Sequence, residues 1–474
     1  MVHLVGHQCY GAPASGERWL KRLADSIGDV ADADCDPWQS QVSWRAHARF
    51  RQRGIDHGSA DDWRAVIARS GALLPVLRSH VGADGGAERR SASLWFFLYT
   101  MFGSIFMLVA IWWLAWKTGS TELARIITDL PALRASQQLT AQGELCLFLS
   151  FVLAFAVKVP LVPFHSWQAK TYSETPAGGA VLLAGAMAKI GVYGFLRFVL
   201  PMFPAMCVEY SSVFVVLGLI GVVGGALVAM AQDDIKRMIA FSSLSHLSLV
   251  MVGIFSFHPA ALAGVPLQMV AHGLSVAALF LLVGYMEART SSRGLDDFGG
   301  LAGRTPIFAL LFVITALASA ALPGTANFIG EFMLLFGSYL GLGFTVALIA
   351  GISVILGAVY LLRVVQRWLY GKRHPSLDRL PDLSASEVLA VVPLLLLSFV
   401  FGFYPKPIND QAVPVVIQLA KEAAAVKATA EKAAAAKVAA AKTAAAKTSA
   451  DQPVAPKSTA IPATAPAAAP SVSP

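Results

Sequence analysis

The sequence predicts an all-α, polytopic transmembrane helical bundle with about nine spans, two of them discontinuous. Apolar residues make up 56% of the 474-residue chain and charged residues only 14%, against roughly 25% charged residues in soluble domains. The apolar residues occur in blocks of about 20, which is the length that a helix needs to cross the hydrocarbon of a bilayer. These observations indicate a membrane protein and not a set of soluble domains.

Three compositional zones divide the chain. Residues 1–90 form a polar N-terminal segment, residues 91–405 carry the hydrophobic blocks, and residues 406–474 form a tail that is first Ala/Lys-rich and then Pro/Ala-rich. Helical length and hydropathy predict nine spans within the middle zone. These are residues 93–116, 143–164, 176–199, 211–231, 238–257, 262–287, 306–339, 343–369 and 386–404.

Two of the predicted spans contain helix breakers. The seventh span is too long for one straight crossing and contains Pro323 and Gly324, and the second span carries Pro160 and Pro163 near its end. Proline interrupts the hydrogen-bond ladder of a helix. In a bilayer, such breaks survive only where protein or a water-lined cavity satisfies the freed backbone groups. The two breaks therefore predict hydrated pathways inside the bundle.

The basic residues of the loops predict the orientation, because Lys and Arg accumulate on the cytoplasmic side. If the first span begins in the cytoplasm, nine crossings place the larger basic set inside. That set is Arg89, Arg90, Lys170, Lys236, Arg237, Arg289, Arg293, Arg304, Arg363, Arg367, Lys372, Arg373 and Arg379. The smaller set, outside, is Lys117, Arg125, Arg134, Arg197 and Lys406. The C-terminal tail is then expected on the periplasmic side.

Several classes of function are not expected. The net charge of +8 is spread over loops and a lysine-rich tail, whereas a nucleic-acid-binding protein gathers basic and aromatic residues on one face. The four cysteines, Cys9, Cys35, Cys146 and Cys207, form no CxxC pair and no cluster with histidines, so we expect no metal or iron–sulfur site in the chain. No dinucleotide fingerprint or P-loop is present. Glycines within 211–231 are expected to serve close helix packing instead.

Five ionisable residues lie deep within the apolar spans. They are Lys158, Lys189, His246, His272 and Glu331. A charge near the centre of a bilayer costs at least about 3 kcal/mol, and such residues usually face the protein interior and mark ion pathways. Counting residues from the span ends places the two histidines at similar depths. The sequence therefore predicts one buried, functional set.

This set is suited to protons. A lysine removed from water loses its proton more readily than one in solution, and a carboxylate that approaches or retreats can switch it. Histidine titrates close to neutral pH and suits a relay between two such stores. Structural readings remain open for each residue. Lys158 could snorkel to the interface, either histidine could bond a neighbouring serine such as Ser245 or Ser275, and Glu331 could be a structural partner for a lysine.

Four motifs resemble the signature of antiporter-like membrane subunits. They are the stretch Phe155–His165 followed by Leu183-Ala184-Gly185 and Lys189, the stretch Asp234–Ala240 leading into Ser242–His246, the run Ala271-His272-Gly273, and Asp297–Leu301. Antiporter-like subunits occur in NADH–quinone oxidoreductase (respiratory complex I), in cation/proton antiporters and in membrane-bound hydrogenases. The segment from Leu322 to Phe332 is most similar to subunit M of the oxidoreductase, because relatives usually carry a lysine where Glu331 stands. The resemblance covers about residues 85–405.

The resemblance implies a bundle of the antiporter-like type and a role for each buried residue. Lys158 would be the central lysine of the proton-input half, Lys189 and His246 would link the two halves, His272 would contribute to the same axis, and Glu331 would lie in the exit half. Electron transfer from NADH to quinone would drive proton movement through this chain in a bacterial inner membrane. NADH, flavin, iron–sulfur clusters and quinone would reside in partner subunits, and the partners would be the other membrane subunits and the lipid bilayer.

The chain also departs from the family. Family members have about fourteen spans, and this chain begins at what resembles the sixth, so the first five and the membrane glutamate that would pair with Lys158 are expected to be missing. A shifted reading frame or a wrong start codon is the expected cause. A component of a multi-subunit cation/proton antiporter, a hydrogenase subunit and a truncated non-pumping paralogue remain alternatives. In the tail, lysines recur every fifth residue from Lys427 to Lys447, a pattern typical of semi-rigid helical spacers; binding to anionic lipid or a neighbouring subunit is the alternative.

Overall fold

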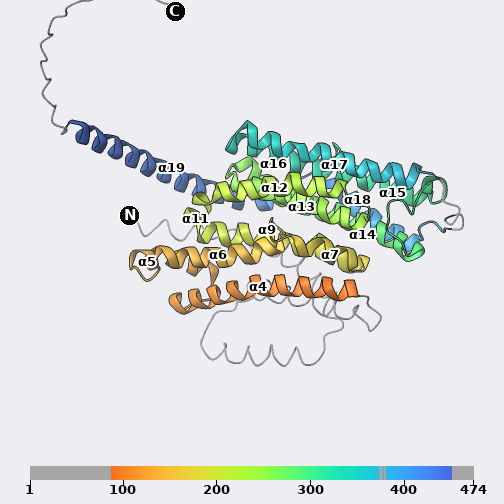
Figure 1. The fold of residues 1–474 in the computed structure, drawn as a ribbon, viewed down its shortest axis with the longest axis horizontal. Helices are drawn as coiled ribbons and strands as arrows, with labels where there is room; N and C mark the ends of the chain where they lie inside the picture. The colour runs from red at the N-terminus through yellow and green to blue at the C-terminus, as the bar shows by residue number, and fades with distance from the viewer. Residues whose placement is uncertain (1–86, 373–376, 378–379, 451–474) are drawn as a thin grey trace, which may run out of the picture. The chain divides into compact units, whose positions relative to one another are not determined.

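The computed structural model describes residues 87–372, 377 and 380–450. In that part of the chain the regular elements are helices, whose long members run side by side (Figure 1). Eight helices there are long and apolar enough to cross a membrane. Seven are α4 (Ala87–Thr118), α6 (Ala141–Lys158), α12 (Ser211–Met230), α13 (Ile235–Phe255), α14 (Pro259–Thr290), α17 (Phe344–Tyr370) and α18 (Ala385–Phe403), and the eighth is the composite run Ala177–Met202. The predicted polytopic helical bundle is confirmed, and most of the predicted polar N-terminal segment lies outside the described residues.

Both predicted helix breaks are present. Helix α6 ends at Lys158, and after a short turn the chain resumes as α7 (Ser166–Glu174). The predicted seventh span consists of α15 (Pro306–Ser319) and α16 (Ala326–Leu342), separated by six residues that include Gly324 at φ +97°. Glycine adopts this left-handed conformation without steric cost. The sequence analysis did not predict that residues 166–174 form a helix.

Side chains satisfy backbone carbonyls that the two breaks free. At the first break, the indole nitrogen of Trp167 donates to the carbonyl of Val157 at 3.1 Å. At the second break, the amide of Asn327 donates to the carbonyl of Ala318 at 2.9 Å. Each donor comes from the helix that follows the break. Because an unpaired buried carbonyl is costly, these bonds allow the interruptions to lie inside the bundle.

The third predicted span is irregular throughout. It consists of α8 (Ala177–Leu182), η2 (Leu183–Met187), α9 (Ala188–Gly194), η3 (Phe195–Val199) and α10 (Leu200–Met202), of which η2 and η3 are π-helical turns. π-turns within α-helices are rare and are frequent at functional sites. The sequence analysis expected a regular helix here.

Three short elements connect the spans, namely α5 (Leu123–Ala135), α11 (Pro204–Glu209) and η4 (Leu301–Gly303). Helix α5 was not predicted, although its buried Leu123, Ile126 and Leu130 follow helical spacing. Its last turn is fixed by Arg134, which pairs with Glu144 of α6 at 2.7 Å. The polar residues between these apolar positions explain why no hydrophobic block was visible.

Gly218, Gly221 and Gly225 of α12 serve close packing, as predicted, whereas a Cβ at Gly224 would meet nothing within 4 Å. A Cβ at Gly218 would lie 2.7 Å from Val252, and a Cβ at Gly225 would lie 3.1 Å from the backbone of Phe241 and Ser245. These contacts bring the backbones of α12 and α13 together. Small residues allow such an approach between membrane helices.

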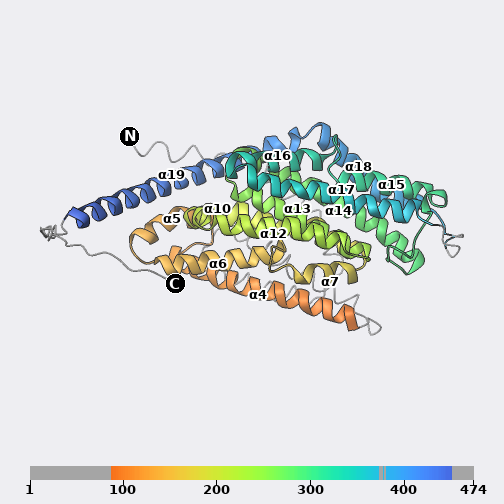
Figure 2. The same ribbon diagram turned by 45° about the horizontal axis from the view of Figure 1, so that its top comes forward.

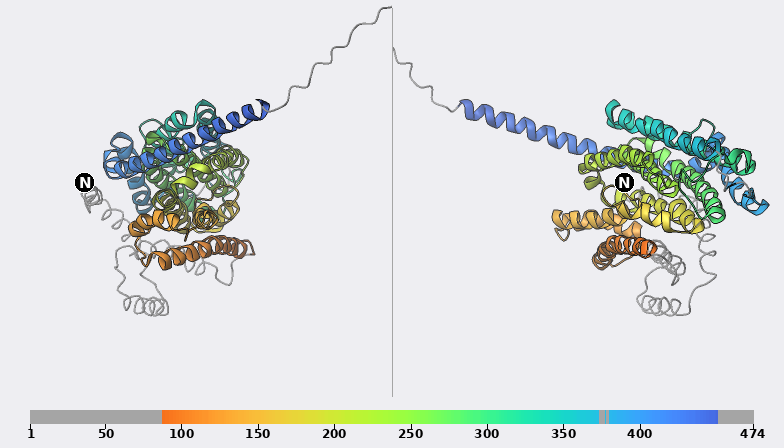
Figure 3. Two further views of the ribbon diagram at one scale, coloured as in Figure 1. Left: turned by 90° about the vertical axis from the view of Figure 1, so that its left-hand side faces the viewer. Right: turned by 45° about the vertical axis from the view of Figure 1, so that its right-hand side comes forward.

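Helices α13 and α14 lie at the centre of the bundle. In the spanning window of α13, 89% of residues are buried inside the protein, against 33% for α4 and 22% for α18. Figures 2 and 3 show α4 at one edge of the bundle, where it packs against α6 and α7. The exposed apolar faces of the edge helices suit contact with lipid or with another membrane protein. The central helices carry His246 and His272.

Helix α19 (Lys406–Ala450) contains the start of the tail. Up to Val426 it belongs to the same compact unit as the bundle, and its Val416, Ala420 and Ala423 join the hydrophobic core. Residues from Lys427 onward form a second unit, in which the lysine repeat is helical as far as Ala450. The Pro/Ala-rich end lies outside the described residues.

Candidate functional site

The five predicted site residues are all largely buried. Lys158 is 2% exposed, Lys189 7%, His272 4% and Glu331 3%, and the side chain of His246 is 11% exposed. They come from α6, α9, α13, α14 and α16. Ionisable groups this deep need partners within the protein, so their contacts decide what the site can do.

A π-turn frees a backbone carbonyl that Lys189 contacts. The N–H of Ala188 bonds the carbonyl of Leu183, five residues back, whereas a regular α-helix would direct it to Ala184. The carbonyl of Ala184 instead accepts from the Lys189 Nζ at 2.6 Å. The same Nζ lies 2.8 Å from Nδ1 of His272. The irregular helix thus supplies one of the two partners of this lysine.

Two histidines lie between Lys189 and the carboxylate of Glu331. The rings of His272 and His246 have centroids 5.3 Å apart, in agreement with the similar depths expected from the sequence. On the far side, Nδ1 of His246 lies 2.9 Å from Oε1 of Glu331. Lys189, His272, His246 and Glu331 therefore form one series across α9, α14, α13 and α16, which we call the central line.

His272 lies between the two residues that the resemblance assigns to the link across the middle. Lys189 contacts His272, and the ring of His272 faces that of His246. The hydroxyl of Ser245 donates to the carbonyl of Val222 at 2.7 Å, and the hydroxyl of Ser275 donates to the backbone of His272. The serines considered as ring partners thus bond backbone groups instead.

A glutamine positions the carboxylate of Glu331. The side-chain nitrogen of Gln268, which is fully buried on α14, donates to Oε1 of Glu331 at 3.3 Å. Gly330 allows this approach, because a Cβ there would lie 2.9 Å from the Cα of Gln268 and closer still to its side chain. Gln268 and His246 thus both contact Oε1 of Glu331.

Lys158 stands apart from the central line. It is the last residue of α6, and its Nζ lies 5.9 Å from the centre of the Phe155 ring. The ammonium makes no hydrogen bond to any residue that the structure describes. The break after Lys158 packs on α9, since a Cβ at Gly191 would lie 2.6 Å from Val159 and 3.0 Å from the Cβ of Lys158. Lys158 therefore lies beside the helix of Lys189 without a direct contact.

A buried hydroxyl pair near the central line was missed by the sequence analysis. The hydroxyls of Ser242 and Tyr360 lie 2.7 Å apart, and the two residues are 4% and 2% exposed. Ser242 precedes His246 by four residues on α13, so both lie on one face of that helix. Ser242 belongs to the recognised motif and could have been singled out. Tyr360, in an apolar span, carried no signal beyond a single hydroxyl.

Charged residues at one end of the bundle form a second, partly buried network. Lys236 pairs with Glu287 at 2.5 Å, and Arg293 pairs with Glu174 and Asp234 at 2.7 Å each. We call these five residues the loop-end cluster. Burial lowers the pKa of the Arg293 guanidinium, but the hydrogen bond to Glu174 and the charges of Asp234 and Glu287 outweigh it, so the pKa is raised. The cluster joins basic residues that the sequence assigned to one side of the membrane.

The central line has the composition of a proton path. A lysine, two histidines and a carboxylate can each bind or release a proton. Two steps of the line are at hydrogen-bond distance, Lys189 to His272 and His246 to Glu331, and the two rings face each other between them. Within the described part of the chain, no group of three or more His, Cys, Asp and Glu side chains could hold a metal ion.

Comparisons with known proteins identify the family of the chain. The family model for NADH:quinone oxidoreductase/Mrp antiporter, TM matches residues 70–357. The chain is 39% identical to NADH-quinone oxidoreductase subunit M of Rickettsia typhi over 338 residues, which are 71% of this chain and 67% of that protein. It is also 39% identical to subunit M of Pseudomonas aeruginosa, covering 71% and 66% of the two chains.

Solved structures show the same fold. A chain of respiratory complex I from Thermus thermophilus superposes with a TM-score of 0.68 at 30% identity, covering 76% of this chain and 74% of that chain. A chain of the Mrp complex from Dietzia has a TM-score of 0.65 at 19% identity, covering 78% and 76%, which shows a shared fold alone. By sequence and by structure, this chain belongs to the NADH:quinone oxidoreductase/Mrp antiporter family of membrane proteins.

Proposed function

We propose that this chain is a proton-translocating membrane subunit of an NADH–quinone oxidoreductase in a bacterial inner membrane. It contributes no redox centre: NADH, flavin, iron–sulfur clusters and quinone belong to partner subunits, and the chain contacts other membrane subunits and lipid. Its C-terminal tail is on the periplasmic side. The whole complex is the enzyme, and this chain moves protons.

The central line is the observation that carries the proposal. Its three bases outnumber its single acid, and Lys189, His272, His246 and Glu331 are joined by contacts of 2.8 Å, 5.3 Å between ring centroids, and 2.9 Å. A static structural pair balances one cation against one anion. A series of bases ending in an acid instead allows a proton to occupy alternative positions, which transport requires.

The Ser242–Tyr360 pair extends the line, and Lys158 lies beside it. Lys158 ends α6 at the first break and packs beside α9, so we assign it to proton input. The hydroxyl pair lies one helical turn from His246, toward the loop-end cluster. A hydroxyl both donates and accepts a hydrogen bond, so this pair can pass a proton between Glu331 and that end of the bundle.

A second candidate function is cation/proton exchange within a multi-subunit antiporter. The family model includes Mrp antiporters, and the fold is shared with the Mrp complex at 19% identity. The identities of 39% to subunit M proteins and 30% to a chain of complex I favour the first function. The two functions differ in what drives proton movement: electron transfer from NADH in the first, and a cation gradient in the second.

Membrane vesicles that hold the complex with this chain test the proposal. NADH is added, and quinone reduction and proton uptake into the vesicles are recorded together. Glu331→Gln, which keeps the shape of the side chain and removes its charge, should lower the number of protons moved per electron while quinone reduction continues. Glu209→Gln, at an exposed glutamate on α11, is the matched control and should change neither.

Two results would contradict the proposal. If Glu331→Gln leaves the proton-to-electron ratio unchanged, the central line does not carry the protons. If a sodium gradient moves protons through this chain in the absence of NADH and NADH has no effect, the antiporter function is correct instead.

A further inference from the structure

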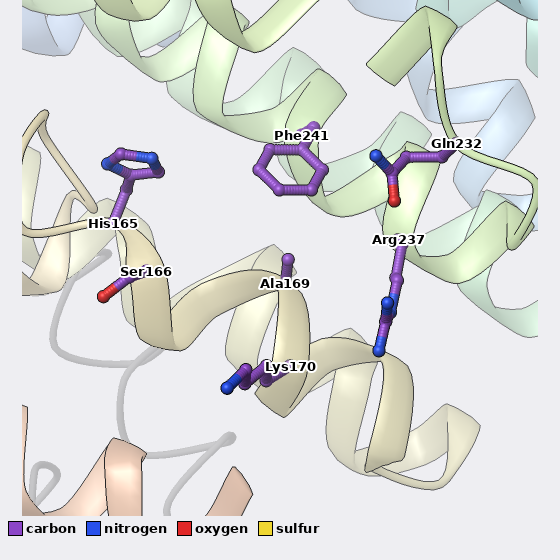
Figure 4. Close-up of a pocket in the computed structure, with 7 residues that line it drawn as sticks. All are labelled: His165, Ser166, Ala169, Lys170, Gln232, Arg237 and Phe241. Atoms are coloured by element: carbon purple, nitrogen blue, oxygen red, sulfur yellow. The ribbon is translucent and has the colours of Figure 1, made fainter. Parts of the chain in front are cut away.

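A pocket of about 310 Å³ lies at the start of α7, away from the central line. Figure 4 shows its lining: one wall comes from the first break and α7, and the other from the α12–α13 corner and α13. The seven lining residues are His165, Ser166, Ala169, Lys170, Gln232, Arg237 and Phe241. The lining combines two permanent cations, three neutral polar side chains and an apolar floor, and it contains no acidic residue.

Within the described ranges, the two cations of the pocket lack carboxylate partners. Elsewhere at this end, Arg89 and Arg293 pair with Glu174, Lys236 with Glu287, Arg289 with Glu387, and Arg367 with Asp296. Among the described residues, neither Lys170 nor Arg237 has a carboxylate oxygen within 4.0 Å. Asp234 precedes Arg237 by three residues, but its oxygens accept from backbone N–H groups of α13 and from Arg293.

The neutral lining residues add hydrogen-bonding capacity. Nδ1 of His165 is buried and has no hydrogen-bond partner in the described part of the chain. The amide of Gln232 is held at the corner by its bond to the carbonyl of Val228 at 3.1 Å. A planar guanidinium beside an ammonium and amide donors is the chemistry that binds a phosphate group.

The surroundings of the pocket are those of a membrane interface. Lys170 lies over the ring of Trp95 at 5.5 Å, and tryptophan is enriched where the hydrocarbon meets the headgroups. Gln232 lies in the short loop between α12 and α13, where the chain leaves the apolar spans. Exposed apolar side chains flank the pocket on both neighbouring helices, with Leu98 of α4 at 53% and Leu227 of α12 at 51%.

From this combination we propose that the pocket binds the phosphate headgroup of an anionic phospholipid. Arg237 and Lys170 bind the phosphate oxygens, and the acyl chains lie on the exposed apolar faces of α4 and α12. Basic pockets between membrane helices on the cytoplasmic side bind anionic lipid headgroups in this manner. The lipid would join the helix that follows the first break to α13, and thus bridge two elements that carry or adjoin the site.

Native mass spectrometry of the full chain in detergent tests the proposal, with phosphatidylglycerol and phosphatidylcholine as the two probes. We expect phosphatidylglycerol to bind more tightly, and the double substitution Lys170→Gln and Arg237→Gln to weaken its binding about 30-fold, as expected for two basic residues near a surface. Lys170→Gln alone, at an exposed position, should give about 5-fold. This single variant allows the test even if the double variant does not fold.

Arg125→Gln, at an exposed pair near the other end, is the control and should bind like the unaltered chain.

Three outcomes would overturn the proposal. Equal affinity for the two lipids would show that the cations do not select a headgroup with net negative charge. Unchanged binding of phosphatidylglycerol by the Lys170→Gln variant would place the lipid elsewhere. Binding of inorganic phosphate alone, at a concentration at which the lipid has no advantage, would identify the ligand as a free anion.

Discussion

Two networks of charge in this protein differ in how their charges are paired. In the loop-end cluster, Lys236 and Arg293 each contact carboxylates, so the positive charges are neutralised in place. In the central line, a lysine contacts a histidine, which faces another histidine, and only the last residue is a carboxylate. Exclusion of a charge from water therefore does not by itself indicate function. A network of paired opposite charges fixes helices, whereas a series of bases that ends in one acid leaves protons free to redistribute.

The largest expected effect on stability comes from the loop-end cluster. Lys236 is 1% exposed and bonds both Glu287 and the carbonyl of Thr175. Removal of one partner of a buried ion pair costs 3–5 kcal/mol. Because Glu287 is partly exposed, we expect about 3 kcal/mol for Lys236→Met, at the low end of that range. Thermal unfolding of the purified chain in detergent measures it, and a midpoint equal to that of the unaltered chain would show that the cluster is not structural.

A smaller loss of stability is expected where the first break packs on α9. In Gly191→Ala the new methyl group would lie 2.6 Å from Val159 and 2.8 Å from its backbone nitrogen. Overpacking of this kind costs about 1–3 kcal/mol. Gly351→Ala on α17, where a Cβ meets nothing within 4 Å, is the matched control in the same unfolding assay. Equal midpoints for the two variants would show that α6 and α9 are not tightly packed at this point.

The smallest effect on stability is expected at the hydroxyl pair. Tyr360→Phe removes one hydrogen bond to Ser242, worth about 1 kcal/mol. If the pair passes protons, the same variant should slow proton movement severalfold in vesicles with little change in quinone reduction. Tyr339→Phe, at an exposed tyrosine of α16, is the control. Unaltered proton movement in the Tyr360→Phe variant would restrict the pair to a structural role and sharpen the boundary between the two networks.

The comparison also shows what the sequence could predict. Hydrophobic blocks predicted the spans, and Pro160, Pro163 and Pro323 predicted the two breaks, because proline and hydrocarbon impose strong local constraints. The cost of burying charge predicted that Lys189 and the two histidines would lie inside. These features follow from the chain's local chemistry and need no knowledge of the packing.

The contacts within the site could not be predicted in the same way. That His272 lies between Lys189 and His246 depends on how α9, α13 and α14 rotate against one another. The π-turn before Lys189 results from packing, since Leu183–Met187 has the composition of an ordinary apolar helix. Tyr360 comes from a distant span, and only the folded structure brings it to Ser242.

The most direct test of the central line is the proton-to-electron ratio of the complex with Lys189→Ala in membrane vesicles. We predict that quinone reduction and assembly persist and that the protons carried by this chain are lost, because the contact that begins the line is removed. Lys117→Ala, at the end of α4 over the ring of Trp116, should keep the full ratio. A full ratio in the Lys189→Ala variant would contradict the account.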